Sequence, residues 1–126
     1  LKGETNLSHL AVIGGGVIGI EIAQIYALLG IEVTVFELLP EVLPGFDRGC
    51  VQIYRHYLEG LGINVITGVQ VEAVEEAPRD SILIRYRDGD RVKSYSCNRV
   101  LSSIGRRPHY ESAWDPSVPI SVRNGA

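Results

Sequence analysis

Three glycines at fixed spacing, directly behind a short apolar run, constrain this chain more than any other feature. Gly14, Gly16 and Gly19 occupy the three glycine positions of the pattern G-x-G-x-x-G. The preceding residues 9–13 have the composition of a buried parallel strand, and apolar residues at helical spacing follow the last glycine. A strand, a glycine-rich turn and a helix in this order predict a βαβ unit of the kind that binds a dinucleotide.

Each of these glycines has a physical role in such a unit. Gly14 allows the tight turn off the strand, Gly16 lets the backbone approach a pyrophosphate, and Gly19 lets the helix lie close to the strand. The unpaired N–H groups and the positive dipole end at the start of the helix then face the phosphates. The alternative is a glycine turn that only closes a βα unit.

The residues after the loop predict a helix that runs to about residue 29. Gly30 follows at the position where helices commonly end in a left-handed conformation. The β-branched run over 31–37 then predicts a second strand, which completes one βαβ unit. The residues at helical spacing, which we expect on the inner face of this helix, are Ile22, Ala23, Tyr26 and Leu29.

Glu37 closes this second strand, 18 residues after Gly19. Near that spacing an acidic side chain accepts hydrogen bonds from the adenine ribose hydroxyls of a bound dinucleotide. A carboxylate would repel a 2′-phosphate, and residues 38–40 include no arginine or lysine to attract one. Glu37 therefore favours NAD(H) over NADP(H), and a solvated glutamate at a strand end is the alternative.

The middle of the chain predicts a second helix and a third parallel strand. A loop with two prolines spans 40–45, and from about Asp47 apolar side chains recur at helical spacing until Gly60 and Gly62 end the helix. Residues 63–67 have the composition of a strand. The predicted apolar face of the helix consists of Val51, Tyr54, Leu58 and Leu61.

After residue 67 the pattern changes to short strands without helices. Residues 70–74 and 81–86 alternate polar and apolar side chains, and Asp88-Gly89 marks a hairpin into 91–96. Three strands therefore stand where a repeating βα fold would place its next crossover helix. Their many charged side chains are typical of a solvated face.

Residues 99–104 indicate a fourth buried strand that returns to the parallel sheet and leads into Gly105, at the carboxyl edge where doubly wound folds bind ligands. The predicted fold class is therefore α/β: a Rossmann-like parallel sheet with helices and a three-stranded antiparallel β-meander as a crossover. We expect one domain over 1–126, with a core over 8–108. The return segment 109–126 has no clear period, and Trp114 in it is either a local anchor or a contact with another domain.

Composition limits the alternatives. The chain has 126 residues, enough for one domain, and 45% of them are apolar, as in globular proteins. A net charge of −3 argues against a general nucleic-acid binder, and no apolar run is long enough to cross a membrane. The first residue is Leu1 rather than methionine, so we expect a piece excised from a longer protein.

The cysteines and histidines offer no evident chemistry. Cys50 and Cys97 form no paired redox motif, and we expect them to be small buried or half-buried hydrophobic residues in a reducing compartment, cytoplasmic or mitochondrial. The three histidines have neither metal-ligand spacing nor a catalytic-triad pattern, so no metal site and no catalytic residue is predicted within this domain.

The chain closely resembles the NAD-binding domain of the flavin-linked pyridine nucleotide-disulfide oxidoreductases, in particular their dihydrolipoamide dehydrogenase branch. The resemblance spans about residues 10–108 and rests on three segments. These are Val12 to Glu21, Val33 to Glu37, and Ile104-Gly105-Arg106-Arg107-Pro108. The β-meander crossover is also typical of that family.

The resemblance implies a cofactor site. Residues 14–21 would enclose the pyrophosphate and nicotinamide end of NAD, Glu37 would bind the adenine ribose, and Val71 would lie near the adenine. Gly105 would contribute backbone at the nicotinamide end, and Glu21 would lie close to a flavin and the nicotinamide. The full set of cofactor-binding residues is Gly14, Gly15, Gly16, Val17, Ile18, Gly19, Glu21, Glu37, Val71 and Gly105.

The resemblance also implies partners outside this chain. FAD and the redox-active cysteine pair of the family belong to other domains, so we expect an FAD domain and an interface domain in the parent enzyme, which would be a homodimer. Electrons would pass from a dihydrolipoyl dithiol to FAD and then to NAD⁺. The alternatives are a related NADH oxidase, a mercuric-type reductase, or a non-enzymatic module that senses NADH.

Overall fold

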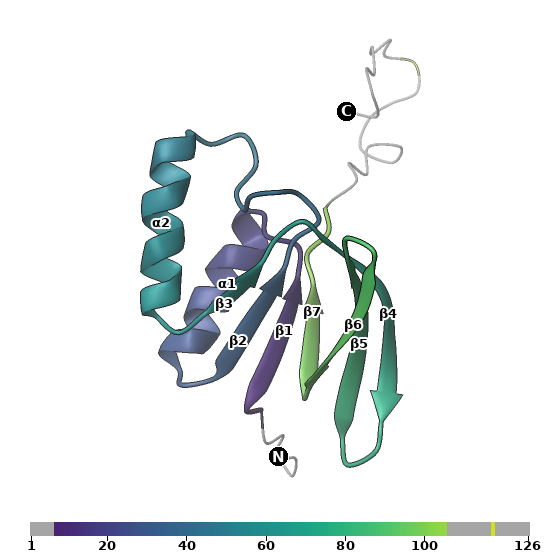
Figure 1. The fold of residues 1–126 in the computed structure, drawn as a ribbon. Coiled ribbons are helices and arrows are strands. Elements are labelled where there is room, and N and C mark those ends of the chain that lie inside the picture. The colour runs from purple at the N-terminus through teal and green to yellow at the C-terminus, as the bar shows by residue number, and fades with distance from the viewer. Residues whose placement is uncertain (1–6, 106–116, 118–126) are drawn as a thin grey trace.

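The computed structural model of the chain describes residues 7–105 and residue 117, and it shows the predicted order of elements (Figure 1). Each element begins and ends within a few residues of the predicted bounds. The return segment with Trp114 lies outside the described residues. The elements are β1 His9–Ile13, α1 Val17–Leu28, β2 Glu32–Phe36, α2 Arg48–Gly60, β3 Asn64–Ile66, β4 Val69–Ala77, β5 Ser81–Asp88, β6 Arg91–Cys97 and β7 Arg99–Ser102.

The parallel sheet has the strand order β3-β2-β1-β7, so the strand that precedes the glycine loop lies at its centre. Leu10 pairs with Val33 of β2 on one side and with Arg99 of β7 on the other, and all these pairings are parallel. The carboxyl ends of β1, β2 and β7 therefore meet at one edge of the sheet. The glycine loop, Glu37 and Gly105 follow these three strands and lie at that edge.

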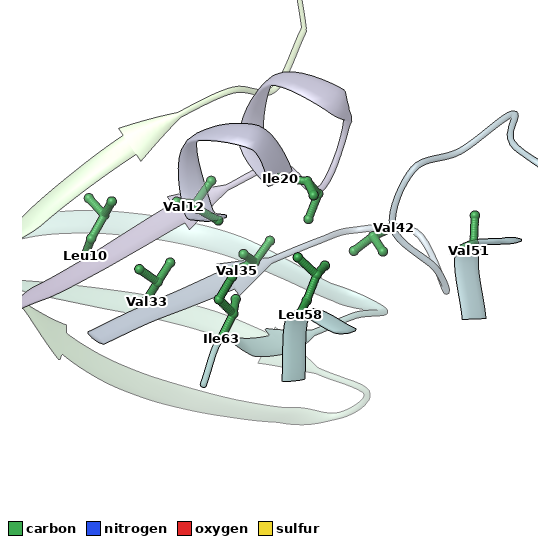
Figure 2. Close-up of a cluster of buried hydrophobic side chains, with 10 residues drawn as sticks. Leu10, Val12, Ile20, Val33, Val35, Val42, Val51, Leu58 and Ile63 are labelled. Atoms are coloured by element: carbon green, nitrogen blue, oxygen red, sulfur yellow. The ribbon is translucent and has the colours of Figure 1, made fainter. Parts of the chain in front are cut away.

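The two helices cover one face of this sheet, and the alternation of side chains along the strands explains why. Leu10 and Val12 of β1 and Val33 and Val35 of β2 point to the same side, because alternate residues of a strand share a face. Figure 2 shows these side chains packed with residues from both helices and with Ile63, the residue before β3. Those partners include Ile20, Val51, Leu58 and Ile63.

The antiparallel sheet β4-β5-β6 covers the opposite face, which confirms the predicted meander. Phe36 of β2 packs against Tyr86 and Tyr95, with ring centroids 5.0 Å and 5.4 Å apart. The buried Thr34 hydroxyl donates a hydrogen bond of 3.0 Å to the hydroxyl oxygen of Tyr95. Thr34 and Phe36, the side chains of β2 that point away from the helices, therefore have partners in the meander.

Two predictions of side-chain environment are wrong. Leu29 lies on the solvent side of α1, because the inner face is formed by Gly19, Ile20 and Ala23. Cys50 is exposed in the first turn of α2, whereas Cys97 is buried as predicted. His9 Nε2 lies 3.0 Å from Glu32 Oε2, because parallel pairing brings these two residues side by side.

Candidate functional site

A cleft of about 630 Å³ opens at the carboxyl edge of the parallel sheet. This volume is within the usual range of small-molecule sites. The glycine loop forms one wall, the residues after β2 and the start of β4 form another, and residues 103–105 after β7 close the far side. Of the ten predicted site residues, five line this cleft, namely Gly14, Gly16, Glu37, Val71 and Gly105.

The glycine loop turns sharply at its first glycine and packs tightly at its last. Gly14 has φ +106°, a conformation that L side chains rarely adopt, and its N–H donates to the carbonyl of Phe36 at 2.8 Å. A Cβ atom on Gly19 would overlap the carbonyl oxygen of Gly14 and the hydroxyl of Ser103. Gly19 is therefore buried behind the loop, where it sets the approach of α1 to the strand ends.

Gly16 differs from its neighbours because its missing side chain faces open space. It is the N-cap of α1, has an extended backbone that any residue could adopt, and a Cβ added there would contact nothing within 4 Å. No side chain caps this helix and no acidic residue lies in its first turn. In contrast, Asp47 caps α2 by accepting a hydrogen bond from the Cys50 N–H. The first amides of α1 therefore lie uncapped beside the cleft, which suits an anionic ligand.

Glu37 is buried at the adjacent corner, with 8% of its surface exposed. One carboxylate oxygen accepts from the Gly15 N–H at 2.5 Å, and the other accepts from the Leu39 N–H at 2.8 Å. Each oxygen of an ionised carboxylate has two acceptor positions, so both can accept a further donor from the cleft. Glu37 therefore fixes the glycine loop as well as lining the site, a role that its spacing in the sequence did not suggest.

The peptide groups of Gly15 are fully engaged within the protein. Its N–H donates to Glu37, and its carbonyl accepts from the Leu43 N–H at 2.8 Å. A Cβ on Gly15 would crowd the buried Val42 side chain. The loop after β2 thus holds the middle of the glycine loop from behind, so the amides available to a ligand are those that follow Gly16.

Ser103 is a site residue that the sequence reasoning did not identify. Its hydroxyl donates to the carbonyl oxygens of Ile13 at 3.1 Å and Gly14 at 2.9 Å, and its N–H also donates to Ile13. These bonds join the end of β7 to the glycine turn and so bring Gly105 to the cleft. The signal that could have identified Ser103 is its position, one residue past the end of β7, which lies next to β1 in the sheet.

Five predicted residues do not line the cleft: Gly15, which is held from behind, Gly19, which lies behind the loop, and three further residues of α1. Val17 and Glu21, from the first half of α1, line a separate groove of about 310 Å³ between α1 and α2. Ile18 lies on the exposed surface of the same helix. Their assignment to the nicotinamide end of the site stays a prediction.

The titratable groups with shifted pKa values lie away from the cleft. Burial raises the pKa of the Tyr95 hydroxyl and of the Cys97 thiol, and both side chains belong to the meander. Within residues 7–105 no three candidate metal ligands are grouped, and no helix in this range is long and apolar enough to cross a membrane.

The structure has a parallel sheet centred on β1, a glycine turn at the edge of that sheet, and an uncapped helix near Glu37 at the end of β2. These features define a dinucleotide-binding fold of the Rossmann type. The sequence profile of the family described as pyridine nucleotide-disulphide oxidoreductase matches residues 1–125. The chain belongs to this family.

Several curated relatives are dihydrolipoyl dehydrogenases. The chain is 38% identical over 104 residues to the enzyme from Thermus scotoductus, a match that covers 82% of the chain and 23% of the relative. It is 33% identical over 115 residues to the enzyme from Geobacillus stearothermophilus, covering 91% of the chain and 24% of the relative. The chain therefore spans about a quarter of the length of these relatives.

Solved structures of the same fold include two reductases. A ferredoxin reductase from Rhodopseudomonas palustris superimposes with a TM-score of 0.77 at 28% identity, covering 92% of this chain and 28% of that one. A flavoprotein disulfide reductase from Escherichia coli superimposes with a TM-score of 0.74 at 26% identity, covering 82% and 22%. Both the predicted fold class and the predicted family are confirmed.

Proposed function

We propose that this chain is the NAD(H)-binding domain of an FAD-dependent disulfide oxidoreductase, specifically a dihydrolipoyl dehydrogenase. The observation that carries the proposal is the open space at Gly16, beside an uncapped helix N-terminus and inside a cleft of suitable volume. Membership of the family and identities of 33–38% to dihydrolipoyl dehydrogenases support it.

The chain's own residues would bind and orient the cofactor. The amides after Gly16 would donate to the pyrophosphate, and the Glu37 carboxylate would accept from the adenine ribose hydroxyls. Val71 and the apolar residues around it would contact the adenine, and the backbone of Gly105 would lie near the nicotinamide. Bound NAD supplies the hydride-transfer chemistry, and the protein supplies position and electrostatics.

The remaining parts of the reaction would lie outside the matched region. We place FAD, the redox-active cysteine pair and the interface domain in the portion that corresponds to the other three quarters of the relatives. The substrate would be a dihydrolipoyl dithiol. The proposal also includes a single domain over 1–126, contact of this domain with an FAD domain, and a parent enzyme that is a homodimer.

Substitution of Gly16 by alanine tests the binding site directly. Because a Cβ there contacts nothing in the protein, Gly16→Ala should leave the thermal unfolding temperature unchanged. If a pyrophosphate approaches the loop at Gly16, the added methyl occupies its position and the affinity for NADH, measured by calorimetric titration, should fall at least about tenfold.

Gly60→Ala provides the matched control. Gly60 also has open space around its Cα, but it lies at the end of α2, away from the cleft. It should bind NADH like the unmodified chain. Unchanged NADH affinity in Gly16→Ala would refute the proposed site.

A non-enzymatic module that senses NADH is the second candidate, and the cleft by itself suits it equally well. An NADH oxidase or a mercuric-type reductase is the third. A complete coding sequence with an FAD-binding region and a cysteine pair would favour the disulfide oxidoreductase, and one without any FAD-binding region would favour the sensor.

A further inference from the structure

Arg55 of α2 holds three separate parts of the chain together. Its Nη1 donates a hydrogen bond of 3.0 Å to Glu41 Oε1, in the loop between β2 and α2. Its Nε donates to Glu59 Oε1 of the same helix at 3.4 Å, and its Nη2 donates to the Val65 carbonyl of β3 at 3.4 Å. With only 28% of its side chain exposed, Arg55 lies packed between these acceptors. The rigid fork of a guanidinium can hold several acceptors in one fixed arrangement.

The contact with Glu41 continues to the glycine loop through the next two residues, which belong to residues 37–47, here called the β2–α2 loop. Glu41 Oε1 also accepts from the Val42 N–H at 3.2 Å. The Val42 side chain is buried directly against Gly15, where an added Cβ would meet its Cγ1 at 2.8 Å. Leu43 then donates its N–H to the Gly15 carbonyl at 2.8 Å. A continuous series of contacts therefore runs from Arg55 to the glycine loop.

Leu43 has a backbone conformation that needs contacts to hold it. Its φ of +52° lies in the left-handed region, which residues with a side chain adopt only where the surrounding structure fixes them. Its N–H is held by Gly15, and its carbonyl accepts from the Phe46 N–H at 3.3 Å. On the preceding side, Arg55 fixes the loop through Glu41. We therefore expect the β2–α2 loop to relax when the Arg55 contact is lost.

The orientation of the Gly15 carbonyl affects the amides that follow it. This carbonyl and the Gly16 N–H belong to one planar trans peptide group, so a contact that holds the carbonyl also holds the plane from which α1 begins. The Leu43 N–H is such a contact. The uncapped first amides of α1 follow this peptide and lie beside the cleft. The position of the β2–α2 loop therefore determines where an anion in the cleft finds its donors.

We propose that Arg55 is a positioning residue for the cofactor site. Through Glu41 it holds the β2–α2 loop in the conformation that orients the Gly15 carbonyl, and it thereby aligns the first amides of α1 with the pyrophosphate. This inference rests on the proposed function. Arg55 does not line the cleft, so it influences the cofactor without touching it. The alternative is a partly exposed ion pair that has no effect on the site.

Arg55→Met tests the proposal in the complete polypeptide from which these residues come. Methionine keeps a long unbranched side chain but has no hydrogen-bond donor for Glu41. We expect the affinity for NADH, measured by calorimetric titration, to fall roughly fivefold or more, because misaligned amides bind the pyrophosphate less well. Arg55→Lys keeps a cation within reach of Glu41 and should restore most of the affinity. Unchanged affinity in Arg55→Met would overturn the proposal.

Arg85→Met is the matched control. Arg85 pairs with Glu75 on the meander, and neither residue lines the cleft. This variant also loses an arginine from a partly exposed ion pair, and it should bind NADH like the unmodified polypeptide. An equal loss of NADH affinity in Arg55→Met and Arg85→Met would contradict the proposal, because a general effect of losing a surface arginine would then explain both.

A double-mutant cycle tests whether Arg55 works through Glu41. Glu41→Ala should weaken NADH binding by a factor similar to that of Arg55→Met, and the double variant should bind no more weakly than either single variant. Two losses that simply multiply in the double variant would show independent effects and would rule out the route through Glu41.

Hydrogen exchange separates this inference from the proposed function, because it requires no cofactor. In Arg55→Met the Leu43 amide should exchange at least about threefold faster, followed by mass spectrometry of peptides from the β2–α2 loop. Unchanged exchange would refute the positioning role whether or not NADH binds. If exchange is faster but the unmodified polypeptide binds no NADH, the proposed function is refuted and the contact of Arg55 with the loop stands.

Discussion

Replacement of Glu37 by alanine is the most informative single perturbation, because the structure assigns this carboxylate two separable roles. It is buried, accepts from the amides of Gly15 and Leu39, and lines the cleft where we propose that the ribose binds. The substitution removes the proposed ligand contact and also removes the hydrogen bond that holds the glycine loop at Gly15.

The two effects have different magnitudes and different readouts. A hydrogen bond to a charged group contributes about 1.5–3 kcal/mol, so loss of the ribose contact alone should weaken NADH binding about 10- to 150-fold. The Gly15 amide is left without its partner, and the Leu39 amide is close to solvent. We therefore expect Glu37→Ala to lower the free energy of unfolding by about 2–4 kcal/mol.

The assay is a pair of titrations with NADH and NADPH, together with chemical denaturation of the free protein. The unmodified chain should bind NADH more tightly than NADPH, because the carboxylate repels a 2′-phosphate. Glu37→Ala should lose that preference. NADPH binding equal to or tighter than NADH binding in the unmodified chain would refute the reasoning, as would a Glu37→Ala variant with unchanged NADH affinity.

Glu32→Ala is the matched control. Glu32 is the first residue of β2, and Glu37 follows the last residue of the same strand. At its own end of the strand Glu32 is exposed and pairs with His9. An exposed ion pair contributes about 0–1 kcal/mol. Glu32→Ala should therefore change stability little and NADH affinity not at all.

Three further predictions concern the walls of the cleft and the meander. Gly19→Ala should destabilise the fold by at least about 1–3 kcal/mol, measured by denaturation, because its Cβ would overlap backbone of Gly14. Ser103→Ala removes the hydroxyl bonds between β7 and the glycine turn, and should lower the free energy of unfolding by about 1 kcal/mol and weaken NADH binding; equal affinity would exclude a positioning role. Burial raises the pKa of Tyr95 above its ordinary value near 10, so its contribution to stability is complete below pH 10 and is lost as pH rises further. Tyr95→Phe should therefore be less stable at neutral pH, because Thr34 loses its partner, and less sensitive to alkaline unfolding; equal alkaline sensitivity would refute this.

The fold was predictable because its local signals agree with one another. The apolar run before Gly14, the helical period after it and the β-branched run to Glu37 each specify one element, and together they specify one βαβ unit. The positive φ of Gly30 follows from its place after the helix. The meander was predictable because alternation and a turn signal at Asp88-Gly89 both indicate strands.

The side-chain errors came from features that depend on neighbours distant in sequence. Leu29 has the spacing of an inner-face residue, but α1 is apolar on nearly all sides, so its sequence does not indicate which face meets the sheet. Cys50 lies at the start of α2, where the exposure of a small side chain depends on how the loop before the helix packs.

The sequence by itself determined the βαβ unit, the meander and the position of Gly16 at the start of a helix, because hydrophobic period and glycine spacing act over short stretches of chain. Only the tertiary structure decided that Glu37 holds the Gly15 amide, that Ser103 fastens β7 to the glycine turn, and that α1 presents an apolar surface outward. Those contacts join residues 22 and 89 positions apart, and they depend on how the sheet edges and helices meet in space.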